Sequence, residues 1–142
     1  MGWLTSRQQE LQNCQNQLTA AEADAERIRG ELADLEGFRD CLSRARENIR
    51  THRTTVREFV NTDFFNWRGH THSRRYLGIA QDRLIDRDYK AVLDGIQTTL
   101  DNINTRRTVL DNSLLDTNNA IHRLRIRINT LWTEIQNHLN WN

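Results

Sequence analysis

The most regular pattern in the chain lies in residues 93–138, which read LDGIQTTLDNINTRRTVLDNSLLDTNNAIHRLRIRINTLWTEIQNH. Alternating steps of three and four residues from Leu93 meet an aliphatic side chain at eleven of fourteen positions. The eleven are Leu93, Ile96, Leu100, Ile103, Leu110, Leu114, Ile121, Leu124, Ile128, Leu131 and Ile135. This 3.5-residue spacing is the heptad repeat of a coiled coil, in which a narrow apolar stripe packs against a partner helix. We therefore predict that these residues form the interaction seam of a long helix.

The three remaining positions of this pattern are polar, namely Arg107, Thr117 and His138. A polar residue on a coiled-coil seam sets the register and the choice of partner. Arg107 fits that role, and it equally fits an arginine whose aliphatic stem lies along the seam while its charge reaches water. His138, like His52 in the first half, is expected to be a partly exposed seam residue.

The first half of the chain has the same rhythm as far as Leu35. Its apolar positions there are Leu4, Leu11, Cys14, Leu18, Ala21, Ala25, Ile28, Leu32 and Leu35. The pattern then continues through Phe38, Leu42, Ala45, Ile49, His52, Val56 and Phe59. Because the step from Leu35 to Phe38 is a second consecutive step of three, it predicts a stammer, which overwinds a coiled coil locally. A bend or looser packing is expected near residues 30–39, where Gly30 and Gly37 also lower the helix propensity.

The composition limits the fold to helices with a thin apolar interface. The chain has 142 residues, the size of one domain, and 37% of them are hydrophobic while 27% are charged. It contains no proline and six glycines, which is too little punctuation for an all-β fold. We therefore predict an all-α fold, a single domain over residues 1–142. Its two patterned halves would form a long antiparallel two-helix hairpin that resembles a coiled coil.

The midpoint of the chain reads FFNWRGHTH (residues 64–72) and separates the two patterned halves. Gly69 can supply the permissive backbone that a chain reversal needs, and Trp67 is placed to cover the end of the seam. The predicted boundaries are helix one over about 4–64, a turn over about 65–72 and helix two over about 73–139. The sequence Asp86-Arg87-Asp88 indicates a kink or a short break near residues 86–90.

Charge and motif content argue against several classes of function. A net charge of +1 gives no global attraction to nucleic acid or to anionic membranes. Arginines gather near the midpoint, but carboxylates interleave with them and no aromatic stripe for base stacking accompanies them, so an acidic partner protein is an equally good explanation.

The chain has no glycine-rich phosphate loop and no catalytic triad or carboxylate pair, so neither an enzyme nor a cofactor is expected. His70 and His72 lack a third ligand, so no metal site is expected.

The cysteines and the apolar runs give two further expectations. Cys14 and Cys41 lie on the same predicted helix, roughly 40 Å apart at about 1.5 Å per residue, and cannot pair within one chain. No apolar run reaches the length of about 18 residues that a membrane span needs. Residues 2–10, GWLTSRQQE, contain no apolar core of a secretory leader, so no leader is predicted.

The placement of Trp67-Arg68-Gly69 between two long helices resembles the WXG superfamily, the small helical-hairpin proteins of type VII secretion in Gram-positive bacteria. The chain looks most like the longer small partners of LXG-type toxins, and by architecture the resemblance covers nearly all of it. It implies that Trp67, Gly69 and Tyr76 shape the tip, since the family has an aromatic residue shortly after the glycine. The family's export signal, an aromatic followed four residues later by an acid, is absent near the C-terminus, where Trp132 is followed by Gln136.

The resemblance implies a non-enzymatic partner, or targeting chaperone, of a type VII-secreted LXG-type toxin. The protein would pack on the helical N-terminal region of that toxin, on a related hairpin protein or on a second copy of itself. One alternative is a self-associating coiled-coil scaffold. Another is a cytosolic two-helix holdase chaperone that uses Trp3, Trp132 and Trp141 at the open end of the hairpin. The expected localisation is the cytoplasm, with leaderless export through type VII secretion left open, and neither nucleic acid nor membrane insertion is expected.

Overall fold

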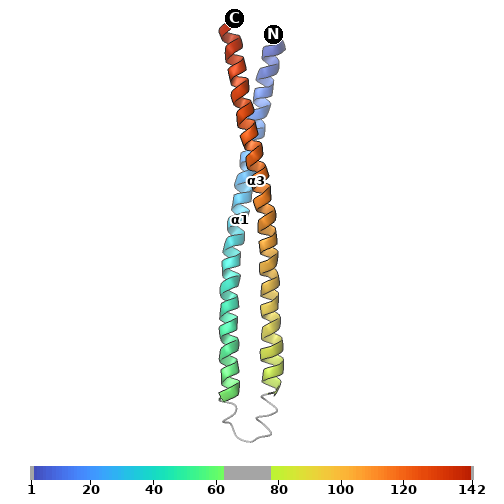
Figure 1. Ribbon diagram of the computed structural model, residues 1–142, viewed down its shortest axis with the longest axis vertical. Helices are drawn as coiled ribbons and strands as arrows, with labels where there is room; N and C mark the ends of the chain where they lie inside the picture. Colours follow the sequence, from blue (N-terminus) through green and yellow to red (C-terminus); the bar gives the residue numbers. More distant parts are fainter. Residues whose placement is uncertain (1, 63–77, 142) are drawn as a thin grey trace. The chain divides into compact units, whose positions relative to one another are not determined.

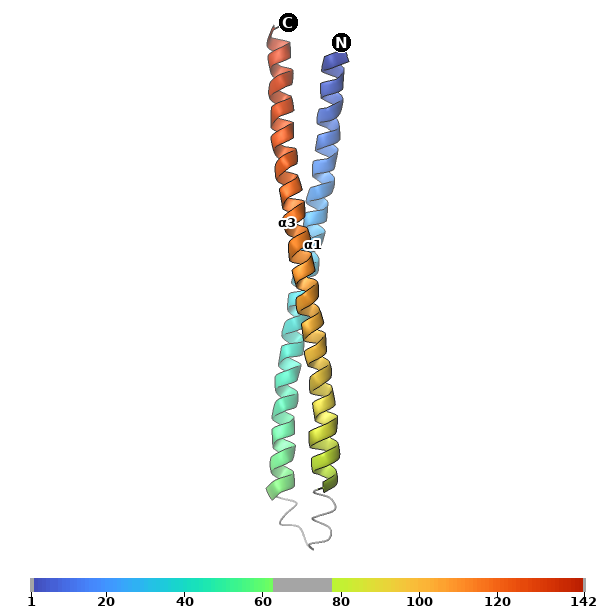
Figure 2. The same cartoon turned by 45° about the vertical axis from the view of Figure 1, so that its right-hand side comes forward.

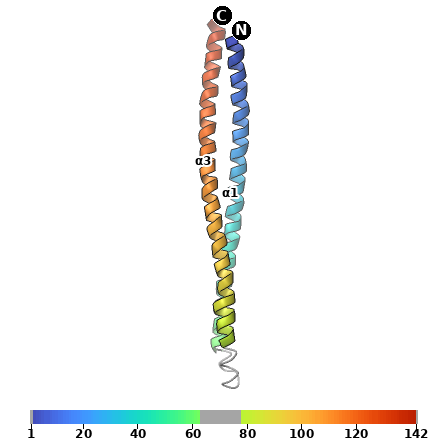
Figure 3. The same cartoon turned by 90° about the vertical axis from the view of Figure 1, so that its right-hand side faces the viewer.

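The computed structural model describes residues 2–62 and 78–141, apart from the side chains of residues 60–62 and 80. Helix α1 spans Gly2–Thr62, and helix α3 spans Tyr89–Trp141 directly after a π-helical segment, η1, over Ala80–Asp88. Figures 1, 2 and 3 show α1 and α3 running in opposite directions. The prediction of an all-α fold with two long antiparallel helices is confirmed. The predicted turn over 65–72 and its residues Trp67, Gly69 and Tyr76 lie outside the described residues.

Hydrogen bonds between the helices fix their antiparallel register. Near the start of α1, Glu10 accepts a hydrogen bond of 2.8 Å from Arg127 Nε, near the end of α3. Further along α1, Arg46 Nη1 donates a hydrogen bond of 2.9 Å to Gln97 Oε1, near the start of α3. Helix α1 begins two residues before the predicted boundary and α3 ends two residues after it, a difference typical of helix ends.

The seam predicted for α3 is the buried face of that helix. Six of its eleven aliphatic residues are buried, namely Leu100, Ile103, Leu110, Ile121, Leu131 and Ile135. The other five, Leu93, Ile96, Leu114, Leu124 and Ile128, are half-buried. Of the polar seam positions, Thr117 and His138 are half-buried and Arg107 is exposed. Apart from Arg107 and Thr117, every heptad position of α3 from Leu93 to Ile135 is aliphatic, so each unit contains a stretch of the apolar stripe.

The stammer predicted in α1 is wrong. Phe38 is 54% exposed and His52 is also exposed, so neither lies on the seam. After Leu35 the side chains turned toward α3 are Arg39, Leu42, Arg46, Ile49, Arg53 and Val56, all half-buried. Their spacing keeps steps of four and three in alternation, so the heptad register runs unbroken from Leu4 to Val56. An arginine replaces the leucine at every second seam position after Leu35, and Phe38 lies beside the seam.

The irregularity predicted near residues 86–90 overlaps the end of the π-helical segment η1. The Tyr89 backbone N–H donates to the Leu84 carbonyl, five residues back, in place of the Ile85 carbonyl that an α-helix would use. A wider helical turn brings residues four apart onto one face. Gln81, Ile85 and Tyr89 accordingly face inward, and Ile85 is fully buried at 0% exposure. The π-helical segment therefore keeps an apolar residue in the interface where the heptad pattern fails.

The chain divides into two compact units. The terminal unit comprises Met1–Asp34 with Arg107–Asn142, and the inner unit comprises Leu35–Arg106. The core of the terminal unit contains Leu11, Cys14, Leu131 and Ile135, and Leu4, Leu124 and Ile128 pack against it. Among the described residues of the inner unit, Ile85, Leu100 and Ile103 are the buried hydrophobic ones. Each unit is thus a pair of antiparallel helical segments held by a thin apolar seam.

Candidate functional site

In the terminal unit, one ion pair between α1 and α3 lies on each side of the seam. On one side Arg125 Nη2 lies 3.0 Å from Glu22 Oε1. On the other side Arg127 Nε lies 2.8 Å from Glu10 Oε1. The hydrogen bond from Arg127 lowers the pKa of Glu10 below its usual value, and the same contact raises the pKa of Arg127. Opposite charges at positions beside a heptad seam set the pairing of the two helices.

Aromatic residues gather at the free end of the terminal unit. The rings of Trp3 and His138 lie 4.6 Å apart between centroids, and the guanidinium of Arg7 lies 5.6 Å from the centre of the Trp3 ring. Trp3, Trp132 and Trp141 are all exposed, the last at 88%. His138 therefore has a packing role against Trp3 at this end of the helix pair.

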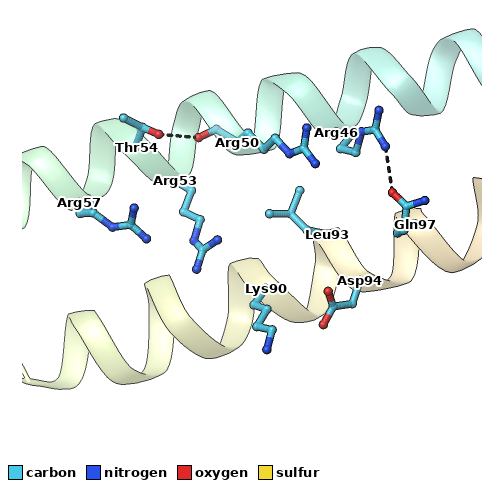
Figure 4. A pocket seen from close by; sticks show the side chains of 9 residues that line it. All are labelled: Arg46, Arg50, Arg53, Thr54, Arg57, Lys90, Leu93, Asp94 and Gln97. Atoms are coloured by element: carbon cyan, nitrogen blue, oxygen red, sulfur yellow. Dashed lines mark hydrogen bonds between the residues drawn. The ribbon is translucent and has the colours of Figure 1, made fainter.

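In the inner unit, one side of the seam is a cleft of about 590 Å³ lined by basic residues. Figure 4 shows the lining residues, which are Arg46, Arg50, Arg53, Thr54 and Arg57 from α1 and Lys90, Leu93, Asp94 and Gln97 from α3. We call this the basic cleft. Its lining has five cations and one carboxylate. Arg50 also pairs with Glu47 at 2.9 Å, and Arg53 lies 4.0 Å from Asp86. The remaining excess of positive charge attracts anionic groups.

Hydrogen bonds to α3 and η1 hold the two seam arginines of the basic cleft. Arg46 Nη1 donates to Gln97, while Arg46 Nε is buried and has no hydrogen-bond acceptor among the described residues. Arg53 Nε donates a hydrogen bond of 3.0 Å to the Ile85 carbonyl. That carbonyl lies in the π-helical segment, where the Tyr89 N–H bonds to Leu84. The π-helical segment thus offers a backbone acceptor to an arginine of the cleft.

The opposite side of the seam in the inner unit exposes apolar side chains together with His52 and Asp88. Phe38 and Phe59 are about half exposed, and they are spaced by a multiple of seven residues from Glu10. A groove of about 230 Å³ is lined by Ile49, Leu84, Asp88, Tyr89 and Val92. Leu84 and Val92 are themselves exposed. We call the exposed residues Phe38, Phe59, Leu84 and Val92 the apolar flank.

The predicted interaction residues and the exposed surface are therefore different sets. The eleven seam residues of α3 are buried or half-buried against the chain itself. The turn motif Trp67, Gly69 and Tyr76 lies outside the described residues. The arginines that gather near the midpoint of the sequence include Arg46, Arg50, Arg53 and Arg57 of the basic cleft, but the contribution of α3 to that cleft was not predicted. Phe38 and Phe59 were predicted on the seam, whereas they lie on the apolar flank.

Other kinds of site have little support in the described part of the chain. No group of three or more His, Cys, Asp or Glu within residues 2–62 and 78–141 could hold a metal ion. None of the described helices is long and apolar enough to cross a membrane. Cys14 is buried, Cys41 is exposed and both are free thiols.

No known protein family, characterised protein or solved structure matches this chain.

Proposed function

We propose that this protein is a non-enzymatic helical partner that binds another helical protein through the apolar flank of its inner unit. The observation that carries the proposal is the exposure of Phe38, Phe59, Leu84 and Val92 beside a seam that is already filled. Leu84 and Val92 line one groove, and Phe38 and Phe59 lie roughly 31 Å apart along α1 at about 1.5 Å per residue, so a partner would contact them along the length of the unit. Exposed apolar surface of this kind marks interaction sites. An amphipathic helix recognises such a surface by inserting residues three and four apart into it.

The Trp67-Arg68-Gly69 sequence suggests the class of partner. Its midpoint position between two long helices resembles the small partners of LXG-type toxins, and the antiparallel helix pair is the architecture that this resemblance implies. The proposed partner is accordingly the helical N-terminal region of an LXG-type toxin of type VII secretion. The seam residues Leu100, Leu114, Ile121 and Ile128 would then hold the hairpin together, and the apolar flank would contact the toxin.

Co-expression with the N-terminal region of an LXG-type toxin encoded beside this protein tests the proposal. A complex that survives size-exclusion chromatography is expected. The double change Phe38→Ser and Phe59→Ser should reduce recovery of the complex at least tenfold, because it removes two exposed aromatic residues from the contact. The matched control changes two exposed residues of the terminal unit, Leu115→Ser and Ile126→Ser, and should leave recovery unchanged.

Two outcomes would overturn this proposal. One is a stable folded monomer that does not bind the toxin region. The other is a stable homo-oligomer that ignores other helical proteins, which would favour a self-associating scaffold.

A second candidate function depends on the exposed tryptophans of the terminal unit. Trp3, Trp132 and Trp141 lie near the chain ends, where a two-helix holdase chaperone would grip an unfolded client. Suppression of aggregation of a model client such as heated citrate synthase, lost on Trp132→Ser and Trp141→Ser, would favour this function. The apolar-flank variants should not affect that activity.

A further inference from the structure

We propose that the basic cleft binds an acidic α-helix of a partner protein, with carboxylates placed to meet successive arginines of α1. This proposal depends on the proposed function in one respect, that the partner is a helical protein. The surface that it assigns to this partner is a different one, on the side of the seam opposite the apolar flank. The occupant is defined by chemistry: a helix whose Asp or Glu residues recur at steps of three and four.

The spacing of the arginines supports a helix as the occupant. Arg46, Arg50, Arg53 and Arg57 follow one another at steps of four, three and four residues along α1. They therefore form one stripe that extends roughly 17 Å at about 1.5 Å per residue. Carboxylates at the same steps on a helix alongside would face each arginine in turn. The groove between two packed helices has the shape that a third helix fills.

The hydrogen bonding of Arg46 supports a carboxylate as the bound group. Its Nη1 is committed to Gln97, while its buried Nε has no acceptor among the described residues. A buried donor without an acceptor is unfavourable, so an arriving acceptor is stabilised. An arginine can bind a carboxylate with two parallel hydrogen bonds, and because Nε is buried the Arg46 side chain has to rotate to present Nε with Nη2 to the partner.

The composition of the cleft favours a protein over a nucleic acid. Its lining contains no aromatic side chain on which a base could stack, and stacking supplies much of the affinity for single strands. Leu93 adds an apolar surface between the helices, which suits the aliphatic part of a helix more than a sugar-phosphate backbone (Figure 4). Asp94 would repel a continuous row of phosphates, but a helix can place a lysine or a neutral residue there.

The test uses the full chain and a fluorescein-labelled helical peptide of alanine and glutamine with glutamates at steps of four, three and four residues. Fluorescence anisotropy should detect saturable binding that weakens as the salt concentration rises, because exposed charge pairs are screened. The same peptide with glutamine in place of each glutamate should bind at least tenfold more weakly. Equal binding of the two peptides would overturn the proposal.

The variant pair Arg50→Gln and Arg57→Gln locates the site. Both residues are exposed or half-buried, and circular dichroism will check that the helices are retained. Affinity for the glutamate peptide should fall at least tenfold. Arg29→Gln is the matched control, because Arg29 has the same heptad position in the terminal unit and pairs with Glu26 as Arg50 pairs with Glu47. An equal loss with the control would overturn the assignment to this cleft.

Three further outcomes are informative. A single-stranded oligonucleotide that displaces the glutamate peptide at lower concentration than unlabelled peptide would replace this proposal with a nucleic-acid surface. Cleft variants that still bind the peptide at full strength would overturn the proposal, and the proposed function would stand if the apolar-flank variants lose the toxin region. Peptide binding at the cleft without any capture of the toxin region would instead support this site and reject the proposed function.

Discussion

In the terminal unit an ion pair links α1 to α3 on each side of the seam. In the inner unit one side of the seam is lined by cationic side chains, and the other side exposes apolar side chains. The heptad positions are the same in both units. Arg50 and Arg57 hold the position of Glu22, and Phe38 and Phe59 hold the position of Glu10, each shifted by a multiple of seven residues. The seam fixes which residues lie beside it, and the chemistry of those residues decides whether the side is satisfied within the chain.

The two units also differ in the residues of the seam itself. The early seam of α1 has Leu4, Leu11, Leu18 and Leu32 at the positions where the inner unit has Arg39, Arg46 and Arg53. An arginine can cover the seam with its aliphatic stem while its guanidinium reaches the edge. The described part of the inner unit contains three of the eleven buried hydrophobic residues, and its seam carries three arginines, which suits a surface used for binding more than one used for stability.

The largest expected change in stability comes from truncating a buried side chain of the terminal unit, compared with an exposed one. Leu131 is fully buried, so Leu131→Ala should lower the free energy of unfolding by about 2–5 kcal/mol through lost burial and the cavity left behind. The control Leu115→Ala removes a side chain that is 61% exposed and should change stability by less than about 0.5 kcal/mol. Urea unfolding followed by circular dichroism measures both. Equal effects would show that the seam is not the stabilising interface.

An intermediate effect is expected from making the inner unit resemble the terminal unit. Arg46→Leu places leucine at a seam position and removes the buried Nε donor that has no acceptor among the described residues. Stability should rise by about 1 kcal/mol, because leucine extends the apolar seam and no buried donor is left without an acceptor. Arg50→Leu, beside the seam, should change it by less than about 0.5 kcal/mol. A loss of stability with Arg46→Leu would mean that its bond to Gln97 outweighs the seam.

The smallest expected effect concerns the ion pair that closes one side of the terminal unit. Arg127 lowers the pKa of Glu10, so the pair stabilises the folded state above the ordinary glutamate pKa of 4.5. That contribution is lost as the pH falls through the lower pKa of the folded state. The melting temperature of Glu10→Gln should therefore lie slightly below that of the wild type at pH 7 and match it at pH 2. A difference that grows as the pH falls would contradict this assignment.

The sequence pattern was sufficient for α3 and misleading for half of α1. Between Leu93 and Ile135 eleven of thirteen heptad positions are aliphatic, so the apolar residues alone identify the buried face. In α1 the apolar pattern assigns the seam position after Leu35 to Phe38, because Phe38 is the nearest hydrophobic residue that follows it. The structure instead turns Arg39 inward, since an unbroken register along one helix is preserved and an arginine stem can fill the position.

The candidate surfaces could not be derived from the pattern in the same way. The basic cleft joins Arg46 and Arg53 of α1 to Lys90 and Gln97 of α3, and that pairing depends on the antiparallel register between two halves of the chain. The apolar flank combines Phe38 and Phe59 with Leu84 and Val92, whose positions depend on the π-helical segment. The irregularity near residues 86–90 was recognisable, but its hydrogen-bond pattern was not, because Asp86-Arg87-Asp88 contains no residue that distinguishes a π-helix from a kink.

The π-helical segment also has a consequence for how the length of this chain can change over evolution. A π-helical turn holds one more residue than the α-helical turn it replaces. Deleting one residue within Ala80–Asp88 would convert that turn to α-helix and leave the seam from Leu93 onward facing α1. The same deletion between Leu100 and Ile135 would rotate every later seam residue by about 100° around the helix axis. A deletion of one residue should therefore be tolerated in the segment before α3 and rejected within α3.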